Sequence, residues 1–290
     1  MAGADHCPGW HPRLLLLEEM RNTFLLSLII LSWFNVYSQV FCFEGNHAFQ
    51  DGETATYDVT YEWGPLWIQA ARVTFTAHKE QYGHHPCWHL KVAGRTLRSF
   101  EFLYKVRDYY ESWVDTVTFR TFEFRRNIYE SGYTLLNTQY WDQNSTRVIS
   151  NTKVRQQPVR SDTLNPGPCV FDMLSSIYYT RTLDLASFPL KEEVSVRVII
   201  DEQAYDIMIR HLGKEMVINR DKRTYKCNKF GVKMVAGTIF KEGEEVMVWI
   251  TDDAQKIPVY IEAKIIVGSV KAYLRNVTID KSTVMTDMQE

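Results

Sequence analysis

Apolar and polar residues alternate with a period of two from residue 53 onward. The apolar members of the first run are Ala55, Tyr57, Val59 and Tyr61. Such alternation is typical of a β-strand with one buried and one solvent-facing side. Gly64 and Pro65 interrupt the pattern, and a second β-rich run covers residues 66–77. The two runs together predict a β-hairpin.

Similar short runs follow along most of the chain, rich in aromatic and β-branched residues and separated by Gly, Asn and Asp. The expected strands cover residues 87–93, 100–106, 109–114, 119–124, 133–140, 146–150, 194–200, 205–210, 216–219, 224–230, 232–240, 245–250, 259–267 and 271–277. Regularly spaced short strands predict antiparallel meanders. The expected fold class is therefore mainly β, as a curved sheet, a sandwich or an open barrel, with one short helix between two β-rich halves.

The clearest interruption of the β pattern lies at residues 152–168, which contain three prolines and a glycine. This segment is the predicted linker between a first half, residues 39–151, and a second half, residues 169–290. Immediately after it, Asp172 can cap a helix. The residues expected on one face of this helix are Leu174, Ile177, Tyr178 and Arg181. We expect both halves to be integrated in one domain.

The first 38 residues have the composition of a leader. Arg21 supplies a positive charge, residues 24–34 are apolar, and Val36 and Ser38 satisfy the small-residue rule for signal peptidase. Translation is expected to start at Met20, with cleavage between residues 38 and 39. The apolar run is shorter than the roughly 20 residues that span a bilayer, so no transmembrane segment is expected after cleavage. The predicted location is the periplasm of a Gram-negative-type bacterium.

Charge and cysteine content narrow the functional classes. The chain has 33 Lys and Arg against 35 Asp and Glu, and the leader holds two of the former and three of the latter, which leaves a net charge of −1. This balance gives no indication of nucleic-acid binding, which needs clustered cations. The cysteines after the leader are Cys42, Cys87, Cys169 and Cys227. They could form two disulfides in three connectivities or remain buried thiols.

The segment VWITDDAQKIPV, residues 248–259, places two adjacent carboxylates between two apolar runs. We interpret it as a hairpin whose Asp side chains bond to nearby backbone N–H groups. Pro258 would then begin the returning strand, where a missing N–H is tolerated. A metal or acid/base site at Asp252 and Asp253 is the alternative interpretation.

The segment HHPCWH, residues 84–89, is the richest in metal-ligand types. On a strand, alternation would place His85, Cys87 and His89 on one face, and imidazole with thiolate suits zinc or copper. No second His or Cys cluster accompanies them. A polar turn that leads into a strand is therefore the preferred interpretation, and no cofactor is predicted.

Carboxylates beside aromatic rings in YKVRDYYESWVD, residues 104–115, could bind or hydrolyse a glycan. Their alternative role is the polar face of an aromatic-rich strand pair. Candidate catalytic carboxylates are Asp108, Asp115, Glu130, Asp252 and Asp253. The chain contains no GxSxG, P-loop, GxGxxG or HExxH motif, so the sequence favours a protein without catalytic activity.

Several segments in order resemble a known family: YEWGPLWIQAARVTF, GRTLRSFEFLYKVRDYYESWVD, FRRNIYESGY, FDMLSSIYYTRTLDL, GTIF and MVWITDDAQKIPVYIEAKIIVGSVKAYL. They are similar to the bacterial exported proteins grouped as domain of unknown function 3108. The resemblance covers roughly residues 43–277. It implies a β-rich protein of the cell envelope with no established activity, and it supplies no catalytic residues.

The leading hypothesis is an envelope protein that binds or carries an apolar, lipid-like ligand on a concave sheet face. A glycan-acting hydrolase and an envelope scaffold that adds a strand to a partner are the alternatives. Candidate ligand-binding residues are Trp63, Tyr104, Arg107, Arg126, Arg181 and Trp249. A polar network of Arg107, Asp108, Arg126, Glu130 and Arg181 is also expected to brace the helix against the first sheet.

Overall fold

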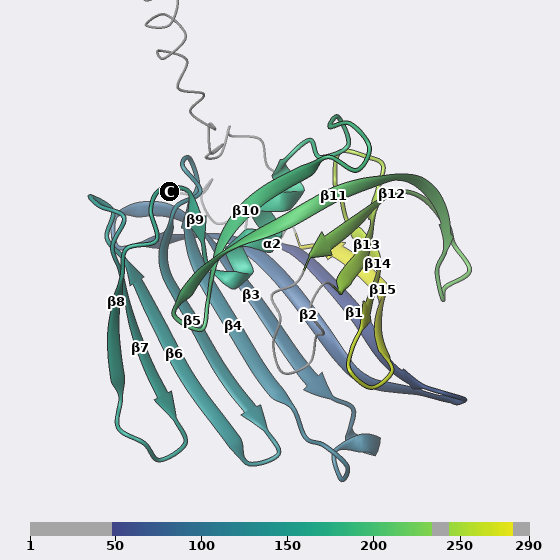
Figure 1. The fold of residues 1–290 in the computed structure, drawn as a ribbon, viewed down its shortest axis with the longest axis horizontal. Helices are drawn as coiled ribbons and strands as arrows, with labels where there is room; N and C mark the ends of the chain where they lie inside the picture. The colour runs from purple at the N-terminus through teal and green to yellow at the C-terminus, as the bar shows by residue number, and fades with distance from the viewer. Residues whose placement is uncertain (1–47, 234–243, 281–290) are drawn as a thin grey trace, which may run out of the picture. The chain divides into compact units, whose positions relative to one another are not determined.

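The alternating runs form the strands of one large sheet in the computed structural model, which describes residues 48–233 and 244–280. The sheet has fifteen strands in the order β8-β7-β6-β5-β4-β3-β2-β1-β15-β14-β13-β12-β11-β10-β9 (Figure 1). Neighbouring strands are antiparallel except β9 and β10, which are parallel. Because β8 and β9 are the two edges, the sheet is not closed into a barrel. The mainly β prediction is confirmed.

The strands of the first half are β1 (Glu53–Trp63), β2 (Leu66–Tyr82), β3 (His85–Thr96), β4 (Arg107–Asp115), β5 (Thr121–Glu130), β6 (Tyr133–Trp141), β7 (Val148–Val154) and β8 (Arg160–Leu164). Those of the second half are β9 (Val170–Phe171), β10 (Glu193–Ile200), β11 (Gln203–Ile218), β12 (Thr224–Lys233), β13 (Glu245–Thr251), β14 (Pro258–Lys264) and β15 (Ser269–Ile279). The helical elements are a 3-10 turn, η1 (Arg98–Phe100), and the helix α2 (Met173–Thr182).

Three sequence expectations differ from these elements. Residues 100–106 form the end of η1 and a loop instead of a strand, with Phe102, Leu103 and Tyr104 exposed and only Val106 bridged to Glu130 of β5. The predicted linker contains the end of β7 and the whole of β8. Residues 205–210 and 216–219 are one strand, β11, whose register shifts between His211 and Gly213. The expected strand at 232–240 lies largely outside the described residues, as do the leader and Cys42.

The alternation predicted for β1 holds in its first half only. Ala55 and Tyr57 are buried as expected. Further along, Thr60 is fully buried and its apolar neighbours are not. The register with β2 shifts at this point, because Ala70 of β2 has no partner on β1, and a bulge on a neighbouring strand is not visible in the pattern of β1 itself.

The helix α2 begins at the predicted cap. The Asp172 Oδ1 atom accepts from the backbone N–H groups of Leu174 and Ser175 at 2.8 and 2.9 Å. Its Oδ2 atom accepts from the hydroxyls of Ser112 on β4 and Thr121 on β5, at 2.7 and 2.8 Å. One carboxylate therefore both starts the helix and attaches it to the sheet.

The core lies between α2 and the sheet face that it covers, here called the inner face. Trp88 and Leu90 of β3 pack there with Leu174 and Tyr178 of α2. Ile177, expected on the buried face of the helix, is instead 43% exposed. The other expected residues, Leu174, Tyr178 and Arg181, are buried, and Ser175 and Tyr179 are buried with them.

Arg181 connects the helix to the first strand. Its Nη1 atom lies 2.6 Å from a carboxylate oxygen of Glu53 on β1, and both side chains are less than 10% exposed. The guanidinium also donates to the backbone carbonyls of Gln255 and Lys256, at 2.9 and 3.2 Å. Arg181 thus braces the helix against the sheet, but through Glu53, which sequence reasoning missed. The expected network does not form, because Arg107 pairs with Glu101, Arg126 pairs with Asp201, and Asp108 and Glu130 accept from Tyr129 and Tyr104.

Candidate functional site

The inner face changes from apolar to polar across the first half of the sheet. Two adjacent rows of cross-strand partners show this change. From β2 to β8 the rows are Phe75, Val92, Tyr110, Arg126, Asn137, Thr152 and Arg160, and Ala77, Leu90, Ser112, Phe124, Gln139, Ser150 and Asp162. The β6–β8 part of both rows is called the polar strip.

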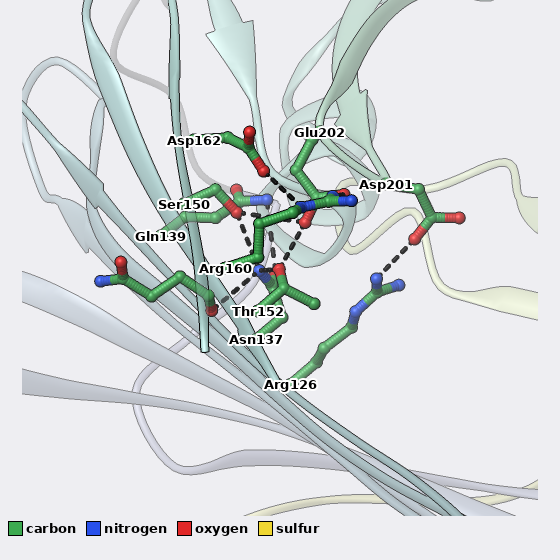
Figure 2. Close-up of polar contacts among 10 residues, drawn as sticks. Arg126, Asn137, Gln139, Ser150, Thr152, Arg160, Asp162, Asp201 and Glu202 are labelled. Atoms are coloured by element: carbon green, nitrogen blue, oxygen red, sulfur yellow. Dashed lines mark hydrogen bonds and ion pairs between the residues drawn. The ribbon is translucent and has the colours of Figure 1, made fainter. Parts of the chain in front are cut away.

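The turn between β10 and β11 closes over the polar strip (Figure 2). A Glu202 carboxylate oxygen accepts from the hydroxyls of Thr152 and, at 3.4 Å, Ser150. Its other oxygen accepts from Arg160 at 3.0 Å. Asn137 donates to the same two hydroxyls at 2.8 and 2.9 Å. Strands far apart in the sheet order are therefore joined by side chains instead of backbone pairing.

Asp201 makes the second contact of this turn, an ion pair with Arg126 of β5. Asp201 and Glu202 have φ values of 46° and 60°, which is the left-handed region normally occupied by Asn and Gly in two-residue hairpin turns. The turn therefore holds two carboxylates where its backbone would favour other residues, at a cost of order 1 kcal/mol each. Their bonds to the polar strip offset this cost.

A groove lies on the opposite, outer face, where it crosses β2 to β6. It has a volume of about 650 Å³, within the roughly 300–1,000 Å³ that small-molecule sites occupy. Four spacings between five strands make it about 19 Å long. One wall consists of Thr74, Ala93, Tyr109, Asn127 and Leu136, and the other of Thr76, Lys91, Glu111, Arg125 and Thr138.

The two walls differ in chemistry. The first is uncharged and exposes Tyr109 and Leu136 by 50% and 47%. The second carries the charges, of which Glu111 is bonded to His89 at 3.1 Å and Arg125 is paired with a buried glutamate, Glu123. No carboxylate of the described residues forms an ion pair with Lys91. The groove is amphipathic. One wall, here called the apolar wall, is uncharged and exposes Tyr109 and Leu136, and it faces a charged wall in which Lys91 has no ion pair with the described residues.

A smaller cavity of about 240 Å³ lies between the end of α2 and the β13–β14 turn. The turn has the predicted structure, because Asp253 Oδ1 accepts from the backbone N–H groups of Gln255 and Lys256 at 3.0 and 3.1 Å. Asp252 instead pairs with Lys214 and Lys226 at 2.8 and 2.9 Å, and hydrogen bonds from these lysines hold its pKa far below the usual range. Both carboxylates are thus engaged in stabilising the turn.

The other candidate carboxylates separate into two groups. Asp115 caps the β4–β5 turn by accepting from Val117 and Thr118. Asp108 and Glu130 lie close enough to affect each other: burial raises the pKa of Asp108 to about 6, and the charge of Glu130 adds to the shift. Glu130 also accepts from the Tyr104 hydroxyl at 3.1 Å.

The metal-ligand candidates are otherwise engaged. Both ring nitrogens of His89 face carboxylates, at 2.8 Å from Glu80 and 3.1 Å from Glu111. Cys87 is a buried free thiol whose pKa burial raises to about 11, and the His85 ring packs against Phe122. In the part of the chain that the structure describes, no three His, Cys, Asp or Glu side chains are arranged to hold a metal ion.

The cysteines form neither two disulfides nor only buried thiols, which were the two expectations from the sequence. Cys87 and Cys227 are free and buried, whereas Cys169 is disulfide-bonded. Two disulfides among the four cysteines are therefore excluded. Burial also raises the pKa of Cys227 to about 11, so neither free thiol is reactive at neutral pH.

The predicted ligand-binding residues do not form one site. Trp63 is 59% exposed at the β1–β2 turn, whereas Trp249 is buried and donates to Glu215 at 2.9 Å. Arg107 pairs with Glu101 beside the β3–β4 loop. The six candidates are Trp63, Tyr104, Arg107, Arg126, Arg181 and Trp249. Arg126 borders the outer groove between its two walls, but its side chain belongs to the inner row and pairs with Asp201, and Arg181 lines the smaller cavity.

Sequence analysis missed the groove residues because, taken one at a time, they are ordinary residues of a protein surface. Lys91, Tyr109 and Leu136 belong to three different strands and match no motif. Their outward-facing positions follow from strand alternation, but only the cross-strand register brings them into two facing rows. The sequence therefore indicates which face each of these residues occupies, but it does not give the cross-strand register that brings them together.

Comparisons with known proteins identify a family and a fold. A family model described as protein of unknown function (DUF3108) matches residues 56–275. The crystal structure of a beta-barrel-like protein of domain of unknown function DUF1849 from Brucella abortus is similar, with a TM-score of 0.52 and 8% identity over 79% of this chain and 97% of that chain. A candidate lipoprotein from Parabacteroides distasonis has a TM-score of 0.31 and 11% identity over 81% of this chain and 100% of that chain.

No curated protein matches the sequence. None of the helices in residues 48–233 and 244–280 is long and apolar enough to cross a membrane.

Proposed function

Because the chain belongs to the DUF3108 family of proteins of unknown function, whose name assigns no reaction, we propose from its geometry that it is an exported binding protein of the bacterial envelope. The ligand is an elongated amphipathic, lipid-like molecule that lies in the groove across β2 to β6. The single observation that carries this proposal is the facing of an apolar wall and a charged wall along about 650 Å³ of groove.

The two walls define the ligand. Tyr109 and Leu136 offer exposed apolar surface along the groove, and burying such surface contributes about 25 cal/mol per Å². Lys91 forms no ion pair with a described carboxylate, because its cross-strand neighbour Glu111 is bonded to His89, and this favours an anionic headgroup at that wall. An acyl chain with an acidic head satisfies both walls, and a length of about 19 Å accommodates an extended chain.

The inner face is less suited to this ligand. Its apolar half is filled by the core, in which Trp88 and Phe124 are almost fully buried. Its other half is the polar strip, whose side chains are bonded to one another and to Glu202 and offer an acyl chain no apolar surface. The expected apolar ligand is therefore assigned to the outer face and not to the concave inner face.

Native mass spectrometry of the exported protein from its own host, followed by organic extraction, tests the proposal. We expect a co-purifying amphipathic lipid and saturable binding of a fluorescent fatty acid to the stripped protein. Leu136→Glu should weaken this binding about tenfold, because it places a charge on the apolar wall. Ile149→Glu is the matched control, since Ile149 is 40% exposed on the neighbouring β7 outside the groove lining.

Two outcomes contradict the lipid ligand. If Leu136→Glu and Ile149→Glu bind the fatty acid equally well, the groove is not the site. If the stripped protein binds oligosaccharides and no fatty acid, the glycan alternative replaces this proposal, and the Asp108 and Glu130 pair becomes its candidate catalytic centre.

A further inference from the structure

Three loops that are neighbours along one end of the sheet expose large apolar side chains. They are the β1–β2 turn, the β3–β4 loop and the β14–β15 turn. These loops lie at the same end because Glu62 pairs with Ser269 across β1 and β15, and Ala71 pairs with Thr96 across β2 and β3. In Figure 1 they lie on the lower right, at the ends of β1, β3 and β14. We call this set of loops the aromatic rim.

The aromatic rim exposes large apolar side chains on all three of its loops. Trp63 and Trp67 are 59% and 55% exposed in the β1–β2 turn, and Phe102 and Leu103 are 80% and 64% exposed in the β3–β4 loop. Ile266 and Val267 are about half exposed. Single exposed apolar residues are common, but aromatic residues gathered at adjacent loop tips indicate an interaction surface.

Backbone and side-chain contacts hold these loops in place. The backbone N–H of Leu97 donates to Ala70 at 2.9 Å, which joins the β3–β4 loop to β2. The Tyr61 hydroxyl donates to the carbonyl of Val267 at 3.0 Å, which holds the β14–β15 turn against β1. The apolar tips are therefore presented on a supported framework, so their insertion into another phase requires little ordering.

The charges at this end are biased toward the positive sign. Arg98, Lys105 and Lys264 are exposed, and no ion pair joins any of the three to a carboxylate of the described residues. At the same end Glu62 pairs with Lys271 at 2.7 Å and Glu101 pairs with Arg107, and Glu130 accepts a hydrogen bond from the Tyr104 hydroxyl, so the unpaired cations outnumber it. Exposed cations beside Trp and Phe tips are the combination that binds an anionic lipid surface.

We propose that the aromatic rim docks the protein on a lipid bilayer with anionic headgroups. Trp63, Trp67 and Phe102 enter the interfacial region, where amphipathic aromatic rings are favoured. Arg98, Lys105 and Lys264 contact the lipid phosphates, to which cations near a charged membrane surface are attracted. This function uses the loops and is independent of the groove, so each proposal can fail without the other.

Vesicle sedimentation tests the docking, with the exported protein and vesicles of phosphatidylcholine with or without phosphatidylglycerol. We expect binding that increases with phosphatidylglycerol and weakens with salt. Phe102→Asp should lower the binding constant about tenfold, since it removes an inserted ring and adds a repelled charge. Val117→Asp is the matched control, because Val117 is 75% exposed at the other end of β4.

A second measurement locates the inserted side chains. Bilayers of brominated lipids should quench part of the tryptophan emission, and the double substitution W63F/W67F should abolish that quenched part while the protein still sediments. Leu136→Glu, which changes the groove, should sediment like the unmodified protein. The proposal is overturned if the unmodified protein does not bind vesicles, if Phe102→Asp and Val117→Asp behave alike, or if quenching persists in W63F/W67F. Phe102-dependent dimers formed without lipid would also overturn it.

Discussion

At the scale of single residues, partly buried carboxylates in this protein are distinguished by their partners. Asp252 is held ionised by two lysines. Among the described residues, Asp108 has the backbone N–H of Tyr129 as its one hydrogen-bond donor, at 3.2 Å, together with the nearby charge of Glu130. Burial consequently dominates at Asp108 and favours its neutral form. Two aspartates that are both candidates in the sequence thus have pKa values shifted in opposite directions by their surroundings.

The raised pKa of Asp108 predicts a pH-dependent stability. The folded chain binds this proton up to about pH 6, whereas the ordinary value is 3.8. Stability therefore falls as pH rises between these values. Asp108→Asn keeps the acceptor and does not titrate, so its unfolding free energy relative to the unmodified protein should rise by on the order of 1 kcal/mol from pH 4.5 to 7.5.

Urea denaturation at the two pH values measures this difference. Asp206→Asn is a suitable control, because Arg197 lowers the pKa of Asp206, and its removal should give no relative gain as pH rises. A difference for Asp108→Asn that is the same at both pH values would rule out titration of this group as the source.

At the scale of elements, the short helix α2 is held by its two ends. Asp172 attaches its first turn to β4 and β5, and Arg181 attaches its last turn to β1 and the β13–β14 turn. A helix of ten residues is marginal alone. Its stability therefore comes from these polar anchors and from the aromatic core beneath it.

Replacement of Arg181 by Met should destabilise the fold by about 3 kcal/mol, because it leaves the Glu53 carboxylate buried without a partner. The double substitution E53Q/R181M should recover part of this loss, since no uncompensated charge remains. Urea titrations of both variants provide the measurement. A double variant that is less stable than R181M alone would show that Glu53 is not the group left unpaired.

At the scale of the whole sheet, edges β8 and β9 are not joined to each other by backbone hydrogen bonds. The polar strip and the β10–β11 turn provide a side-chain connection between the two halves instead. Side-chain bonds of this kind contribute roughly 1–3 kcal/mol each when charged. We call this connection between the polar strip and the β10–β11 turn the seam. We infer that the seam opens before the strands of the central sheet separate.

Glu202→Ala should expose that seam, with a loss of about 1–2 kcal/mol. Hydrogen exchange should become faster in β8 and in the β10–β11 turn and remain unchanged in β1 to β3. Glu192→Ala is the control, because Glu192 is exposed near the opposite end of β10 and no described residue forms an ion pair with it. Uniformly faster exchange across the sheet would contradict a local seam.

The sequence by itself determined the mainly β class, the hairpins, the cap at Asp172 and the turn at Asp253. These features depend on alternation, capping and turn chemistry, which act over a few residues. The sequence pattern did not predict β8, because Arg160 and Asp162 lie on an edge strand with no apolar face. It also predicted a strand from the apolar residues 100–106, which form the loop of the aromatic rim.

Only the tertiary structure decided the groove, the seam and the partner of Arg181. Each brings together residues from separate strands, as when Lys91 and Leu136 reach one groove or when Glu202 reaches Thr152. Such contacts depend on register and on bulges, and a shift of one residue reverses the face of every side chain that follows. Local patterns therefore determine which elements form, and long-range pairing determines which side chains meet.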